Sequence, residues 1–193
     1  MIITLPSEIV ISNVELTENI PNFVTESLNM KIKSRSRGLH RLEGSMDINI
    51  GKSVQAQKAW RGFLVNIQGR FNEFQIDLPL MFKSEIIRNP TMQLANGIGS
   101  NEIALSVFVG TLYAGSMITF LNDTKIYTVL ENVIGGGTMK IYPALRQAQL
   151  SNSTIEAVNP VITAKFTDDS QSYSLTENGF QLESSMEWVE HLA

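Results

Sequence analysis

Two segments of opposite charge hold the side chains best suited to polar chemistry. Lys31, Lys33, Arg35 and Arg37 occur at every second position. This spacing places all four cations on one face of an extended strand. The segment 168–190 contains no Lys or Arg, and its acidic residues are Asp168, Asp169, Glu177, Glu183, Glu187 and Glu190.

These opposite charges predict a contact surface, because charges at the rim of an interface set its register and its rate of association. The cationic row could meet the acidic segment within one sheet or across an interface between subunits. The simpler interpretation is that both are solvated strand faces. If the two segments meet across an interface between subunits, the candidate subunit-interface residues are Lys31, Lys33, Arg35, Arg37, Glu183 and Glu187.

The residues that usually carry catalysis are scarce. The sequence has no cysteine and only two histidines, His40 and His191, which are too far apart in sequence to form a metal-binding motif. No serine lies in the G-x-S-x-G pattern of a nucleophile elbow. We therefore expect no catalytic residue, no cofactor and no metal, and hence not an enzyme.

Composition limits the protein class further. The chain has 193 residues, of which 43% are hydrophobic and 18% charged, as in globular domains, and its net charge is -4. An acidic chain lacks the surplus of cations that nonspecific DNA binding needs. The N-terminal segment has no secretory signal, and no apolar run is long enough to insert in a membrane. A soluble protein that assembles in the cytoplasm is expected.

Hydrophobic periodicity predicts mostly strands and one helix. Alternating apolar residues over 28–37 and 42–50 suggest a hairpin that turns at Gly38. An apolar stripe with helical spacing follows, between a potential N-cap at Ser53 and a potential C-terminal stop at Gly69. Its members are Ala56, Ala59, Trp60, Phe63, Leu64 and Ile67.

The rest of the chain indicates short strands. Turn residues interrupt 91–142 at short intervals, including Gly135 to Gly137, which is typical of a small barrel or sandwich. Segments 161–166 and 185–192 indicate two further strands around a turn at 178–179. The predicted fold class is mainly β (α+β).

Three groups of motifs, in this order, resemble the distal tail proteins of siphophages. The first comprises LHRLEG at 39–44, QKAWRGFL at 57–64 and GRFNEF at 69–74. The second comprises LYAGSMI at 112–118, IYTV at 126–129 and KIYPAL at 140–145. The third comprises PVITAKF at 160–166 and QSYSLT at 171–176. The resemblance covers the chain from about residue 35 onward, and residues 1–25 match least.

The resemblance implies a β-sandwich-like, ring-forming core domain with one helix, made of residues 1–87 and 160–193. An OB-like barrel over 88–148 would be inserted, with 149–159 as connector. Such proteins are structural components of the bacteriophage virion. They form a ring, in this family a hexamer, at the tail tip or baseplate, and they are assembled in the host cytoplasm. The implied partners are the tail tube protein, the tail-tip hub protein and, only in transit, the tape-measure protein or DNA.

Two other interpretations follow from the resemblance. A barrel of this kind could act as a carbohydrate-binding module at the host surface, with Phe108, Tyr113, Tyr127 and Tyr142 as its aromatic residues. The cationic row could instead face DNA in the ring. That arrangement is disfavoured, because tight binding of phosphate would hinder the passage of DNA.

Overall fold

The computed structural model describes residues 2–50, 53–78, 82–175 and 182–192. The described chain is mainly β with one helix, which confirms the predicted fold class. Two compact units are present. The first contains residues 1–17, 42–77 and 161–193, and the second contains 18–41 and 78–160. Segment 18–41, assigned from the sequence to the core domain, thus groups with the barrel segment.

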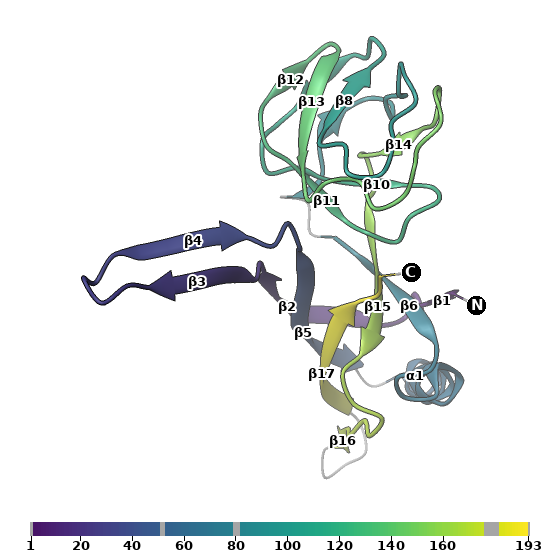
Figure 1. Ribbon diagram of the computed structural model, residues 1–193. Helices are drawn as coiled ribbons and strands as arrows, with labels where there is room; N and C mark the ends of the chain where they lie inside the picture. The colour runs from purple at the N-terminus through teal and green to yellow at the C-terminus, as the bar shows by residue number, and fades with distance from the viewer. Residues whose placement is uncertain (1, 51–52, 79–81, 176–181, 193) are drawn as a thin grey trace. The chain divides into compact units, whose positions relative to one another are not determined.

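The first unit is built on a seven-stranded sheet that joins both ends of the chain (Figure 1). The parallel pair β1–β6 lies at one edge, whereas β15 pairs antiparallel with β6 and β17, and β17 pairs antiparallel with β5. The strand order is β1 (Ile2–Thr4), β6 (Glu73–Asp77), β15 (Val161–Phe166), β17 (Leu182–Glu190), β5 (Arg41–Ile50) and β2 (Val10–Asn19), with β16 (Ser174–Leu175) pairing with β17.

Helix α1 (Val54–Ile67) packs on this sheet as the apolar stripe predicts. Ser53 is the N-cap, and its Oγ accepts a hydrogen bond of 3.3 Å from the amide of Ala56. The stacked rings of Trp60 and Phe63 lie 5.3 Å apart, and Phe63 meets Phe74 of β6 edge-on at 5.8 Å. Left-handed backbone begins at Gln68 (φ 55°), one residue before the expected stop at Gly69.

The expected hairpin across Gly38 is wrong. Residues of β4 (Ile32–Ser36) pair with β3 (Asn22–Glu26), and β5 pairs with β17 over eight positions. The alternation in 28–37 therefore belongs to a separate two-stranded hairpin, β3–β4 (Figure 1). Periodicity identified the strands but could not choose their partners, because adjacent strands in sequence need not be adjacent in a sheet.

The second unit contains a half-barrel around its own apolar core. Its five-stranded sheet has the order β14 (Ile155–Glu156), β10 (Met117–Phe120), β11 (Tyr127–Val129), β13 (Gly137–Tyr142) and β8 (Glu102–Leu105). A three-stranded sheet has the order β12 (Val133–Ile134), β9 (Gly110–Leu112) and β7 (Glu85–Ile86). Segment 149–159, expected as a connector, thus supplies strand β14.

Two further expectations are resolved by the strand bounds. Gly135, Gly136 and Gly137 all have positive φ at the junction of β12 and β13, as expected of a glycine turn. Strand β15 matches the predicted 161–166, and β17 spans 182–190 instead of 185–192. The turn expected at 178–179 lies outside the described residues. Within the described ranges, no helix is long and apolar enough to cross a membrane.

Candidate assembly surface

The hairpin β3–β4 separates the cations from most of its apolar side chains. Its register sets Phe23 opposite Arg35 and Thr25 opposite Lys33. Directly opposed residues project from the same face of a sheet, and the face alternates along each strand. One face therefore carries Phe23, Thr25, Lys33 and Arg35, and we call it the cationic face. The other face carries Asn22, Val24, Glu26, Ile32, Ser34 and Ser36.

Both faces of the hairpin are open to solvent. Every residue in its two strands is exposed, including Phe23 at 61% and Ile32 at 67%. A two-stranded hairpin on its own is marginally stable in water, because no third strand or helix covers it. Apolar side chains are therefore uncovered on both faces of this hairpin in the described chain.

Two further cations border the cationic face. The guanidinium Cζ of Arg37 lies 5.2 Å from the centroid of the Phe23 ring, a cation–π arrangement that orders both side chains. Lys31 lies in the turn, where its amide donates to Ser27 Oγ at 3.2 Å. In the part of the chain that the structure describes, no ion pair involves Lys31, Lys33, Arg35 or Arg37.

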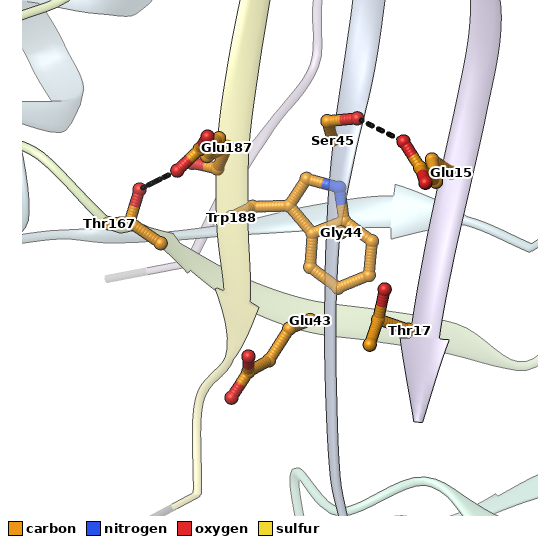
Figure 2. Close-up of a pocket in the computed structure, with 8 residues that line it drawn as sticks. All are labelled: Glu15, Thr17, Glu43, Gly44, Ser45, Thr167, Glu187 and Trp188. Atoms are coloured by element: carbon orange, nitrogen blue, oxygen red, sulfur yellow. Dashed lines mark hydrogen bonds between the residues drawn. The ribbon is translucent and has the colours of Figure 1, made fainter. Parts of the chain in front are cut away.

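An acidic groove of about 270 Å³ lies on the first unit (Figure 2). It is formed by strands β2, β5 and β17 and by Thr167, which follows β15. Three glutamates line it, and its described lining includes no Lys or Arg. The lining residues are Glu15, Thr17, Glu43, Gly44, Ser45, Thr167, Glu187 and Trp188.

Two of these glutamates are held by neighbouring hydroxyl groups. Ser45 Oγ donates to Glu15 Oε2 at 3.4 Å, and Thr167 Oγ1 donates to Glu187 Oε2 at 3.4 Å (Figure 2). A carboxylate has about four acceptor positions, so these bonds orient each group and leave capacity for a further donor. Glu15 and Glu187 are both exposed. The groove therefore presents ordered negative charge to solvent.

The groove also contains a buried donor with an unmet hydrogen bond. Trp188 is fully buried, and its indole Nε1 has no hydrogen-bond partner among the described residues. Figure 2 shows the indole lying across Gly44, between β17 and β2. A Cβ on Gly44 would lie 2.8 Å from Trp188 Cζ2 and would collide with the carbonyl oxygen of Glu15. The glycine is thus required for the ring to lie there.

The acidic segment contributes only part of its charge to the groove. Asp169 Oδ2 pairs with Arg70 Nη2 at 2.9 Å, and buried Glu190 accepts from the amide of Leu42 at 3.0 Å. Glu183 lies opposite Asn49 in the β17–β5 ladder, but its side chain is outside the described structure, as is Glu177. Glu187 is the predicted interface glutamate that the structure places in the groove.

Sequence reasoning missed Glu15 and Glu43. Glu43 belongs to the polar set of the alternating strand β5, but its partner strand could not be identified from periodicity. Glu15 lies in the segment that matches the family pattern least. The pairing of β5 with β17 shows that the contact proposed within one sheet is wrong, because β4 pairs only with β3 among the described strands. The contact between subunits remains a hypothesis.

The two histidines lie in different units. His191 Nε2 lies 2.9 Å from Glu73 Oε1. Burial and the nearby charge of Lys125 lower the pKa of His40 to about 4, so its imidazole is neutral at pH 7. The described residues contain no cluster of His, Asp and Glu that could hold a metal ion.

A buried polar network stabilises the half-barrel. The Tyr127 hydroxyl donates to Asp123 and accepts from the Arg146 amide at 3.0 Å. Burial, together with the hydrogen bond to Asp123, raises the pKa of Tyr127. These groups satisfy one another in the interior, as buried polar groups require.

The aromatic residues expected to bind sugar do not form an exposed platform. Tyr127 is fully buried and Phe108 is 8% exposed, because both belong to the half-barrel core. Tyr142 is half-buried and donates to the carbonyl of Leu39 at 3.2 Å. Tyr113, at 46% exposed, is the one clearly exposed member of the four. The carbohydrate-binding interpretation thus loses most of its predicted residues.

No protein-family model matches this chain, and no curated protein matches it.

Proposed function

We propose that this protein is a structural subunit that assembles into a ring, and that the ring is the distal tail adaptor of a siphophage. The proposal is supported by the ordered motifs that resemble that family. It is also consistent with the division of the chain, in which both ends build one β unit and a central segment builds a half-barrel. In this function the ring joins the tail tube to the tail-tip hub, and DNA passes through its hole.

The observation that carries the proposal is the exposed hairpin β3–β4. Ten strand residues are paired only with one another, and their side chains are exposed on both faces. A subunit of an assembly uses such an uncovered element to contact its neighbour. The function is therefore geometric, and it requires neither cofactor nor catalytic residue.

Particle mass and shape test this proposal. The purified chain is examined by mass photometry and negative-stain imaging, alone and mixed with the tail tube protein of the same phage. A closed particle of about six copies with a central hole is expected. A chain that stays monomeric in both conditions over a wide concentration range contradicts the proposal.

A further inference from the structure

We infer that the cationic face of one copy's hairpin docks in the acidic groove of a second copy. This inference rests on the proposed function and specifies the contact by which the ring would form. The occupant is a second copy because one chain carries both halves of a complementary pair of surfaces. Lys33 and Arg35 supply one half, and Glu15 and Glu187 supply the other.

Charge complementarity selects this occupant. The hairpin has four cations, Lys31, Lys33, Arg35 and Arg37, and in the described chain none of them has an ion-pair partner. The groove has three carboxylates and no cation in its described lining. Bringing the two surfaces together exchanges like-charge repulsion on each for attraction between them.

The hydrogen-bonding groups of the two surfaces are also complementary. Arginine and lysine offer only donors, whereas the Glu15 and Glu187 carboxylates offer only acceptors. A docked hairpin thus supplies donors to carboxylates that have acceptor capacity left.

The contact has the asymmetry that a ring needs. The hairpin and the groove are different surfaces, so each copy can give its hairpin to one neighbour and receive the hairpin of another. Such head-to-tail contacts produce a closed ring when the rotation between copies closes on itself. A two-fold dimer would exchange the same two contacts reciprocally between two copies, so the particle mass distinguishes a ring from a dimer.

Charge reversal tests the contact. Lys33→Glu with Arg35→Glu reverses the hairpin, and Glu15→Lys with Glu187→Lys reverses the groove. Each double variant is expected to raise the half-assembly concentration by more than about tenfold, because attraction becomes repulsion. Combining all four substitutions in one chain is expected to restore assembly. Lys58→Glu with Arg61→Glu, on the exposed face of α1, is the matched control and is expected to assemble normally.

Disulfide trapping tests the position of the contact without changing any charge. The chain has no cysteine, so introduced thiols are the only ones present. Thr25→Cys in one chain and Thr17→Cys in another place thiols on the hairpin and beside the groove. The two variant chains carry tags of different size, and oxidation of their mixture is expected to give a disulfide-linked heterodimer. Asn66→Cys on α1, paired with Thr17→Cys, is the control and is expected to give none.

The outcomes separate this inference from the function on which it rests. Wild-type rings, together with normal assembly of both reversed variants, would overturn the inference and leave the ring function standing. Failure of the variant with all four charge reversals to assemble, together with no disulfide between the Thr25→Cys and Thr17→Cys chains, would overturn it in the same way. A wild type that never associates would overturn both. Restored assembly or the specific cross-link supports the inference.

Discussion

Glu187 lies directly opposite Ser45 across the β17–β5 ladder, and Ser45 in turn donates a hydrogen bond to Glu15 of β2. Three strands from distant parts of the sequence thus converge on one acidic groove (Figure 2). The exposed, cationic hairpin β3–β4 has the opposite charge, and together they form the basis of the proposed assembly.

Assembly is predicted to weaken as salt is added. The proposed contact joins exposed charges, and the Debye length falls from about 10 Å at 0.1 M salt to about 3 Å at 1 M. The fraction of chains in rings, measured by mass photometry at constant protein concentration, should fall steadily over this range. A fraction that rises with salt would instead indicate an apolar contact.

Stability is predicted to decrease as the pH falls from about 6.5 to about 4, in part through His40. The folded state lowers the pKa of His40 to about 4 from the ordinary value of 6.5. Between these values the unfolded chain binds a proton that the folded chain does not, so the stability present above pH 6.5 is lost as the pH falls. Urea unfolding of wild type and His40→Gln should show a flatter pH profile for the variant. Parallel pH profiles for the wild type and the variant would show that His40 does not contribute to the pH dependence of stability.

Gly44→Ala is predicted to destabilise the first unit. The new Cβ would collide with the Glu15 carbonyl oxygen and press on the Trp188 ring, and overpacking of this kind costs about 1–3 kcal/mol. Gly62→Ala is the control. Gly62 lies in α1 with no atom within 4 Å of its Cβ position, so alanine there should stabilise the helix by about 0.5–1 kcal/mol. Equal free energies of unfolding for the two variants would contradict this account.

Tyr127→Phe is predicted to destabilise the half-barrel by about 1–3 kcal/mol, because Asp123 and the Arg146 amide each lose a buried partner. The control is Tyr113→Phe, at a half-exposed site where surface substitutions change stability by less than about 0.5 kcal/mol. Thermal unfolding followed by circular dichroism would compare them. A Tyr127→Phe melting temperature equal to that of wild type would show that the network adds little.

Local features of the fold could be predicted from the sequence, whereas its long-range pairings could not. The capping hydroxyl of Ser53 and the helical spacing of Trp60 and Phe63 are properties of neighbouring residues, and α1 has the predicted position. The partner of β5 lies more than a hundred residues away, and alternation contains no information on which strand will pair with it. The hairpin at Gly38 was wrong for this reason.

The candidate assembly surface was likewise predictable in its local features but not in its long-range pairings. Alternation alone placed Lys33 and Arg35 on one strand face, and the structure retains that face in β4. The groove could be identified only from the strand pairings in the structure. The pairing of β5 with β17 brings Glu43 to the groove, and the neighbouring strand β2 brings Glu15. Two acidic residues of segment 168–190 do not line the groove, because they bind local partners. Asp169 pairs with Arg70, and Glu190 accepts from the Leu42 amide.

Negative-stain imaging of wild type beside the Lys33→Glu/Arg35→Glu variant, each with the tail tube protein, tests the proposed ring and its contact. Rings of about six copies with a central hole are expected for the wild type, and dispersed, folded monomers are expected for the variant. A wild type without rings in any condition would contradict the claim that this chain is a ring-forming adaptor.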